Sequence, residues 1–132
     1  MEIRELKSDK LSKLNGAYSQ AIELVHPEKL VFVSGFTSRD KDGNVVGVGD
    51  IRAQTDQVLS NIQAILAEAG ATMKDVVKYT IYITDMKLFG EIGDIRRQYF
   101  SEPYPACATV EVSRMVNSDH LIEIDAIAAV RA

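Results

Sequence analysis

Hydrophobic residues recur every three or four positions between residues 50 and 69, which predicts a long amphipathic helix. Asp50 suits the N-terminus of this helix, and Gly70 suits its C-terminal cap. The side chains expected to face the core are Ile51, Thr55, Val58, Leu59, Ile62, Ile65, Leu66 and Ala69.

A second helical pattern starts at Asp85 and contains two glycines, Gly90 and Gly93. Each glycine costs a helix about 1 kcal/mol relative to alanine. That cost indicates either a close approach of another backbone or a weakly formed first turn. The stripe of this helix comprises Phe89, Ile92, Ile95, Arg96 and Tyr99.

Six runs of alternating or β-branched residues predict strands, over residues 2–7, 19–25, 30–35, 76–84, 106–113 and 120–130. The segment HPEK between the second and third runs is typical of a hairpin loop. The order of strands and helices predicts an α+β or α/β layer, with the two helices packed on one face of a sheet.

The last two predicted strands each carry a hydrophobic face and a polar face. In the last strand Glu123 and Asp125 share a face that must meet solvent, a partner or another subunit. The opposite face should lie under the helices and comprises Ile122, Ile124, Ala126, Ala128 and Val130. In the preceding strand the apolar side comprises Ala108, Val110 and Val112, and the polar side Cys107, Thr109, Glu111 and Ser113. These patterns predict a polar sheet face that forms an intersubunit surface or a site.

Composition and charge narrow the classes of function. The 132 residues predict a single domain, 1–132, which is large enough to bury a core without disulfides. The net charge of −4 disfavours nucleic acid or an anionic membrane as the main partner. Arg96 and Arg97 are interpreted as part of a solvated helix face. A single cysteine and the lack of an apolar signal segment or membrane-length run favour a soluble, cytoplasmic protein.

Motifs for nucleotides and metals are weak. The segment DGNVVGVGD, residues 42–50, lacks the ending of a phosphate loop and the third glycine of a dinucleotide fingerprint, so Asp42-Gly43 is interpreted as a turn. His26 and His120 have no cysteine or carboxylate at zinc-binding spacing and are expected at the surface. No nucleophile elbow is present.

Cys107 lies on the polar side of its predicted strand. A reactive thiol needs a nearby base or cation to lower its pKa, and the strand offers neither. Glu111 on the same side would oppose formation of the thiolate. From the residues alone, Cys107 is interpreted as a small, half-buried thiol.

Five segments together resemble the Rid family, also called the YjgF/YER057c/UK114 family. They are GAYSQAI (16–22), VFVSG (31–35), QTDQVLSNIQAILAEAGATMKDVVK (54–78), YPACATVEVSRM (104–115) and IEIDAIA (122–128). The resemblance covers nearly the whole chain, and the segments occur in the family's order.

The resemblance implies a chorismate-mutase-like α+β fold, in which two helices lie on one face of a mixed six-stranded sheet. It also implies a homotrimer whose sheets form a central barrel, with small-molecule clefts between subunits. The activity that it implies is hydrolysis of a reactive enamine or imine, such as 2-aminoacrylate, to a ketoacid and ammonia. It implies no metal or organic cofactor.

The resemblance also assigns candidate site residues. Glu123 matches the carboxylate that would position or activate the attacking water, and Ser34 and Gly35 match the serine and glycine of a strand-end motif. Tyr18 matches the tyrosine of a G-P-Y-S motif, although Ala17 stands in place of the proline. Phe89 matches an aromatic residue of the second helix.

The chain departs from the family pattern at the substrate-binding positions. Cys107 stands where the enamine deaminases have an arginine that binds the substrate carboxylate, and is therefore expected to face the cleft. A thiol cannot replace the two charge-assisted hydrogen bonds of a guanidinium group. Gly93 replaces a frequent asparagine, and Phe36 a frequent glutamine.

Two hypotheses of function follow from these residues. The first is an enamine or imine deaminase, similar to 2-iminobutanoate/2-iminopropanoate deaminases or to aminomuconate deaminases, with a shifted substrate preference. Its water chemistry would rest on Tyr18, Ser34 and Glu123, and its more apolar pocket on Phe36, Phe89, Gly93 and Cys107. The alternative is a non-catalytic trimer that binds a small metabolite. Ribonuclease activity, also attached to the family, is disfavoured by the acidic charge.

Overall fold

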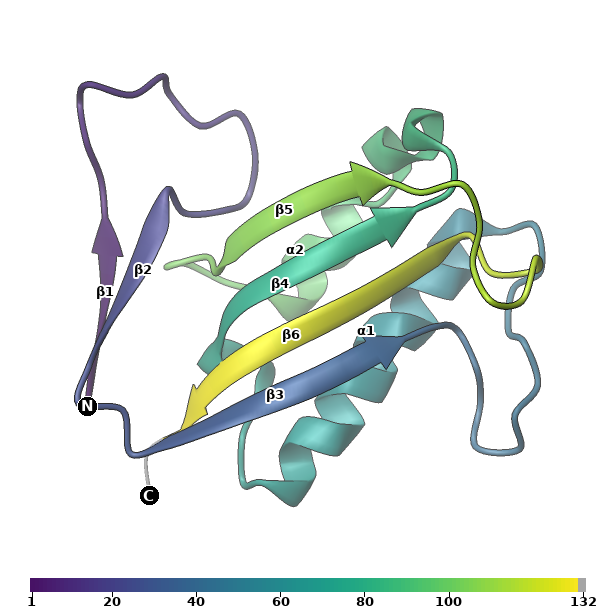
Figure 1. Cartoon of the computed structure of the whole chain (residues 1–132), viewed down its shortest axis with the longest axis horizontal. Coiled ribbons are helices and arrows are strands. Elements are labelled where there is room, and N and C mark those ends of the chain that lie inside the picture. The colour runs from purple at the N-terminus through teal and green to yellow at the C-terminus, as the bar shows by residue number, and fades with distance from the viewer. Residues whose placement is uncertain (131–132) are drawn as a thin grey trace.

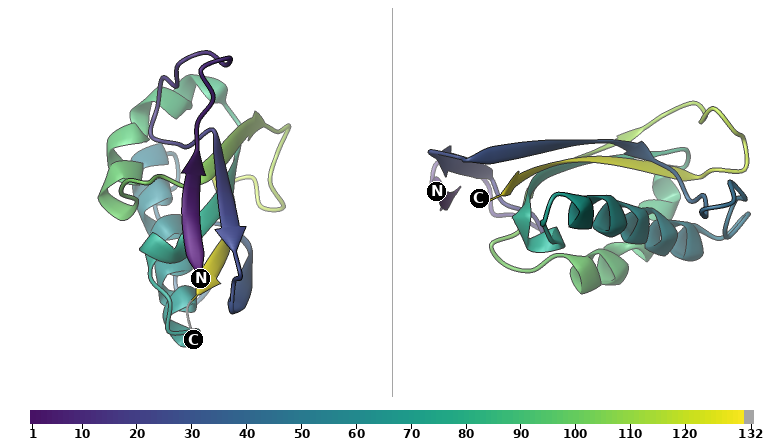
Figure 2. Two further views of the ribbon diagram at one scale, coloured as in Figure 1. Left: turned by 90° about the vertical axis from the view of Figure 1, so that its left-hand side faces the viewer. Right: turned by 90° about the horizontal axis from the view of Figure 1, so that it is seen from below.

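The chain folds into a layer of strands covered on one face by helices (Figures 1 and 2). The structure is a computed structural model that describes residues 1–130. Its strands are β1 (Glu2–Leu6), β2 (Ala21–Val25), β3 (Lys29–Phe36), β4 (Val76–Ile83), β5 (Ala106–Glu111) and β6 (Ile122–Val130). Its helices are α1 (Ile51–Glu68) and α2 (Gly93–Tyr99), with 3₁₀ turns η1 (Met73–Asp75) and η2 (Met86–Glu91). No helix among the described residues is long and apolar enough to cross a membrane.

The six predicted strands are present, but they form two sheets instead of one. Four strands pair in the order β3-β6-β4-β5, with β4 and β5 parallel and the other pairs antiparallel. β1 and β2 form a separate antiparallel ladder beside one end of this sheet (Figure 1). The predicted hairpin between β2 and β3 is therefore wrong. The link between them is three residues long and begins at His26 with a φ of 54°, and β1, not β3, pairs with β2.

Helix α1 confirms the first helical prediction, including both ends. The Asp50 carboxylate accepts hydrogen bonds from the backbone N–H groups of Arg52 and Ala53, both at 3.1 Å. At the other end Gly70 takes a φ of 70°, a conformation that favours glycine.

The second predicted helix is split into the 3₁₀ turn η2 and the short helix α2. Asp85 caps the 3₁₀ turn by accepting a hydrogen bond from Lys87 N at 3.0 Å. No heavy atom lies within 4 Å of a Cβ placed on Gly90, and on Gly93 it would meet the Arg97 side chain. Close approach of another backbone therefore does not account for these two glycines. They agree instead with a weakly formed first turn, because the segment begins as a 3₁₀ turn and becomes α-helical only at Gly93.

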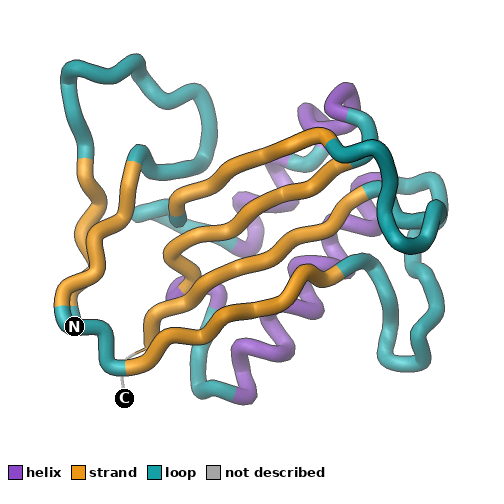
Figure 3. Tube along the Cα trace, viewed as in Figure 1, coloured by secondary structure: helices purple, strands orange, loops and turns teal. Residues whose placement is uncertain are grey.

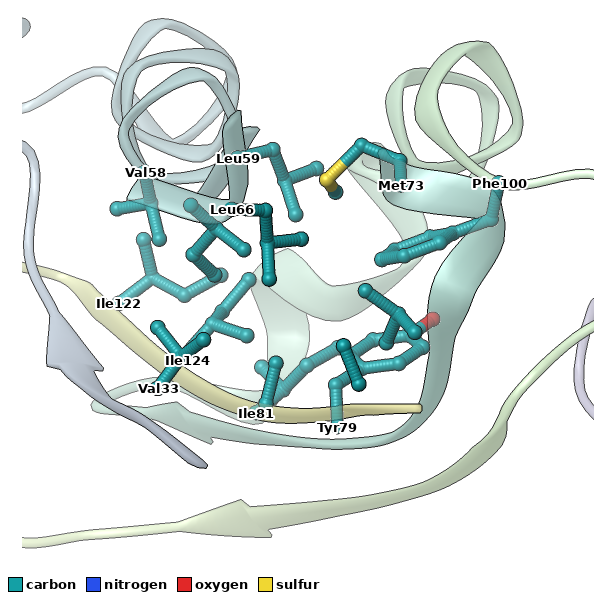
Figure 4. Packing of buried hydrophobic residues seen from close by; sticks show 14 of the residues in the cluster. Val33, Val58, Leu59, Leu66, Met73, Tyr79, Ile81, Phe100, Ile122 and Ile124 are labelled. Atoms are coloured by element: carbon teal, nitrogen blue, oxygen red, sulfur yellow. The ribbon is translucent and has the colours of Figure 1, made fainter. Parts of the chain in front are cut away.

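The core lies between the helices and the sheet (Figure 4). Side chains of α1, among them Val58, Leu59 and Leu66, are fully buried against Ile81 and Ile124 of the sheet. The predicted inward face of β6 is confirmed, because Ile122, Ile124, Ala126, Ala128 and Val130 are all buried. Glu123 and Asp125 lie on the open face, the sheet face opposite the helices.

β5 is turned the other way from the prediction. Its parallel register places Cys107 beside Tyr79, which faces the helices, so Cys107 packs against the core. Ala108 and Val110 are exposed on the open face. The open face is therefore mixed, not uniformly polar. β5 is an edge strand, and its half-covered inner face tolerates polar side chains that a central strand would not.

Candidate functional site

A β-bulge in β3 brings Gly35 against Glu123. Val33 pairs with Ala126 and Phe36 with Ile124, so two residues, Ser34 and Gly35, oppose one residue of β6. A Cβ placed on Gly35 would lie 2.2 Å from Glu123 Oε2, which no real contact allows. Glycine at this position is thus what lets the carboxylate lie against the β3 backbone.

The loop after β3 and the loop before β6 lie at the same end of the sheet (Figure 3). Glu123 lines a cleft between residues of these two loops. We call this the Glu123 cleft. Its volume is about 360 Å³, and its walls are Gly35, Thr37, Arg39, Gly43, Val116, Asn117, His120 and Glu123. A carboxylate, a guanidinium group and an imidazole therefore share one small cavity, which can hold a small polar molecule and a water.

Gln54 of α1 ties the two loops of the cleft together. Its side chain is fully buried. The amide nitrogen donates to the carbonyl oxygens of Gly47 at 3.0 Å and Asp119 at 2.8 Å, and the amide oxygen accepts from Leu121 N at 2.7 Å. These bonds use a helix residue to fix the backbone on either side of His120.

His120 is buried, at 3% exposure, and the prediction that it lies at the surface is wrong. Its Nδ1 lies 3.4 Å from Oγ of the buried Ser38. Burial lowers the pKa of the imidazole, and the nearby Arg39 charge lowers it further. His120 is therefore uncharged at neutral pH. His26, by contrast, is exposed as predicted.

Phe36 lies beside the Glu123 cleft and not in it. It lines a neighbouring cavity of about 740 Å³ with Asn61 and Ile65 of α1, and it packs partly against the core. Arg39 lines both cavities. Ser34 is exposed on the open face, next to Gly35 in the bulge.

Cys107 belongs to a second group at the β5 edge, which we call the Cys107 cluster: Cys107, Tyr79, Arg96 and Phe89. Nη1 of Arg96 donates to the Tyr79 hydroxyl at 3.0 Å, and the guanidinium carbon lies 4.9 Å from the centre of the Phe89 ring. Burial raises the pKa of the Cys107 thiol, although Tyr79 and Arg96 act in the opposite direction. The thiol is therefore protonated at neutral pH.

Arg96 is buried, at 9% exposure, so its interpretation as part of a solvated face is wrong, whereas Arg97 is exposed. The Nε of Arg96 has no hydrogen-bond partner among residues 1–130. Its neighbour Tyr79 stacks on Phe100, with ring centres 4.5 Å apart. Burial and the nearby Cys107 raise the pKa of Tyr79. The Arg96 guanidinium group therefore holds the side chain of Tyr79 in place at this edge of the sheet.

Tyr18 is half-buried in the loop between β1 and β2, close to the start of β5. The adjacent Ser19 holds this loop, because its N–H donates to Pro105 O at 3.2 Å and its hydroxyl donates to Tyr104 O. Tyr18 is therefore placed beside the segment that leads into β5.

The structure separates the predicted site residues into two groups. Ser34, Gly35 and Glu123 come together, with Phe36 in the next cavity, whereas Tyr18, Phe89 and Cys107 lie at the β5 edge. Sequence reasoning missed Arg39, Gln54 and His120. No local pattern marks them. Gln54 and His120 bond to groups 65 and 82 residues away, and Arg39 lies near Glu123 only in the folded chain.

Comparison with known proteins agrees with the fold. The family model described as Endoribonuclease L-PSP matches residues 10–130. The chain belongs to this family. The structure of RidA from the Antarctic bacterium Psychrobacter sp. PAMC 21119 superposes on this Endoribonuclease L-PSP family member with a TM-score of 0.72 and 31% identity, covering 96% of this chain and 99% of that one. The predicted Rid-family resemblance and the α+β fold class are confirmed.

Relatives of this family member include named deaminases. The RutC family protein PYRAB12510 of Pyrococcus abyssi is 43% identical over 92% of both chains. The 3-aminoacrylate deaminase RutC of Acinetobacter baylyi is 40% identical over 78% of this chain and 81% of its own. The 2-iminobutanoate/2-iminopropanoate deaminase of Dermatophagoides farinae is 32% identical over 87% of both. The family thus includes enzymes that act on enamines and imines.

Proposed function

We propose that this chain hydrolyses a small reactive enamine or imine to a carbonyl compound and ammonia, with Glu123 activating the attacking water. The observation that carries the proposal is the position of the Glu123 carboxylate, held against Gly35 in the wall of a cleft of about 360 Å³. Ligand pockets span roughly 300–1,000 Å³, so this one suits a small metabolite. The activities of the two named deaminases support the same chemistry.

The reaction needs one base and one water molecule. Starting from a protonated imine, Glu123 accepts a proton from water while the water oxygen forms a bond to the C=N carbon. Glu123 then returns the proton to nitrogen, the C–N bond breaks, and ammonia leaves with the electron pair. The hydroxyl group loses its proton to solvent as the carbonyl forms. An enamine enters the same path after its carbon takes up a proton from solvent. Ser34 and Tyr18 are proposed to position the water and substrate.

We place the complete site between chains of a homotrimer. Glu123 faces the open side of the sheet, whereas Cys107 faces the helix side at the β5 edge. One chain therefore separates Glu123 from Tyr18 and Phe89, and a neighbouring copy would supply them. The open face also carries Phe32, which is 72% exposed and would be covered in such an assembly.

The test is ammonia release from 2-aminoacrylate, generated in the assay from serine by a dehydratase. We expect Glu123→Gln to lower the rate by about 10²- to 10⁴-fold, the range typical for removal of a general base. The matched control is Asp125→Asn, which alters a carboxylate on the same face that accepts from the Tyr82 hydroxyl at 3.0 Å. Asp125→Asn should keep most of the activity.

Two results would contradict the proposal. Unchanged turnover by Glu123→Gln would remove Glu123 from the chemistry. Wild-type protein that binds a 2-oxoacid but accelerates no imine hydrolysis would favour the non-catalytic binding module. The net charge of −4 does not favour the RNA cleavage that the family's description names.

A further inference from the structure

The loop that carries Arg39 is fixed on both sides. Asn61 of α1 donates from Nδ2 to the carbonyl oxygens of Thr37 at 3.2 Å and Arg39 at 2.9 Å. Across the loop Arg39 pairs with Val45 in an isolated β-bridge. The Arg39 side chain therefore starts from an anchored backbone at the edge of the Glu123 cleft.

The Arg39 guanidinium group makes no hydrogen bond or ion pair with the residues that the structure describes, 1–130. The ion pairs within residues 1–130 involve Arg4, Lys7 and Arg52, and Arg39 takes part in none of them. Arg96, by contrast, is buried and bonded to Tyr79. Arg39 lines the Glu123 cleft, and within the described part of the chain its guanidinium donors remain available.

The charges around the cleft suit a molecule with one anionic end. Glu123 supplies a base, His120 is uncharged, and Arg39 supplies a cation. We propose that Arg39 binds the carboxylate of a small imino or enamino acid, and so replaces the arginine that position 107 lacks. A guanidinium group binds a carboxylate through two parallel hydrogen bonds. This inference rests on the proposed function and names its substrate class.

The Cys107 cluster cannot do the same work. Cys107 is a protonated thiol at neutral pH, and the Arg96 guanidinium group is held between Phe89 and Tyr79. The absence of an arginine at position 107 alone would suggest a preference for imines without a carboxylate. With Arg39 in the cleft, the proposed substrate retains its carboxylate. Carboxylate recognition has moved from β5 to the loop after β3.

The experiment compares an anionic with a neutral substrate. The anionic substrate is 2-aminoacrylate, and the neutral one is butan-1-imine, produced in the assay from butylamine by an amine oxidase. We expect Arg39→Gln to raise KM for 2-aminoacrylate about 10- to 100-fold, as loss of a charge-assisted pair does, with a smaller effect on kcat. Arg39→Lys should recover part of the loss. Turnover of butan-1-imine should not change.

The matched control is Lys41→Gln, which removes a cation of the same loop that lines only the neighbouring cavity. It should leave both substrates unaffected. An equal loss on both substrates with Arg39→Gln, or no loss on either, would overturn the inference.

The two proposals can fail separately. Loss of activity in Glu123→Gln with full activity in Arg39→Gln would keep the deaminase and remove Arg39 from recognition. If wild type releases no ammonia, binding of 2-oxobutanoate by calorimetry decides the inference alone: about 10-fold weaker binding by Arg39→Gln supports it, and equal binding refutes it.

Discussion

The Glu123 cleft and the Cys107 cluster use similar side chains in opposite ways. Both contain an arginine, but Arg39 lines an open cavity and forms no ion pair with residues 1–130, whereas Arg96 is buried against Phe89 and Tyr79. The cleft leaves its charged groups accessible to a ligand. The cluster uses its arginine and its thiol to pack the edge of the sheet.

This difference teaches that an arginine is a candidate for ligand binding only where its guanidinium group remains accessible. At position 107 a half-buried thiol packs against the core, whereas Arg39 lines the wall of the cleft that also contains Glu123. Whether an arginine can bind a ligand depends on the burial and the bonding partners of its guanidinium group. Neither can be predicted from the residues next to it in the sequence.

The largest effect expected in the cleft, beyond the changes already described, comes from Gly35→Ala. The added Cβ would lie 2.2 Å from Glu123 Oε2, and because Gly35 has no positive φ the backbone can remain while the carboxylate moves. We expect about 10²-fold lower activity, as for a catalytic group displaced by about 1 Å, with little change in urea stability. The control Gly90→Ala has open space around it. Full activity of Gly35→Ala would show that the contact does not matter.

Within the Cys107 cluster, a change at Arg96 should affect stability more than activity. Arg96→Met leaves the buried Tyr79 hydroxyl without its donor and should lower the free energy of unfolding by about 1–3 kcal/mol. The exposed neighbour gives a matched control, and Arg97→Met should stay within about 0.5 kcal/mol. Urea unfolding of both variants measures the difference. Equal stabilities would contradict a structural role for Arg96.

The smallest effect concerns the pH dependence of stability in the cleft. The pKa of His120 is lowered in the folded chain, while the unfolded value is about 6.5. Below about pH 6.5 the unfolded chain therefore binds more protons, so stability falls as pH falls toward and through the folded pKa. Urea midpoints at pH 7.5 and 5.5 should differ less in His120→Gln than in wild type. The charges around the imidazole are Arg39, Asp119 and Glu123. An unchanged difference would refute the role of His120.

Much of the fold could be predicted from the sequence because its signals are local. The spacing of apolar residues, the cap at Asp50 and the glycine at 70 located α1 within one residue at each end. The alternation along β6 separated Ile122 and Ile124 from Glu123, since side chains of a strand alternate between faces. Family resemblance then drew attention to Gly35 and Glu123, which the structure brings into contact.

The orientation of β5, the burial of His120 and Arg96, and the role of Gln54 were decided by tertiary structure. Cys107 faces the helices because its parallel register with β4 places it beside Tyr79, and no property of β5 alone sets that register. Gln54 and His120 find their partners 65 and 82 residues away, respectively. Sequence thus determined the elements and one catalytic candidate, because those depend on neighbours along the chain. The cation of the cleft depends on which loops meet in space, and so only the folded chain distinguishes Arg39 from Arg96.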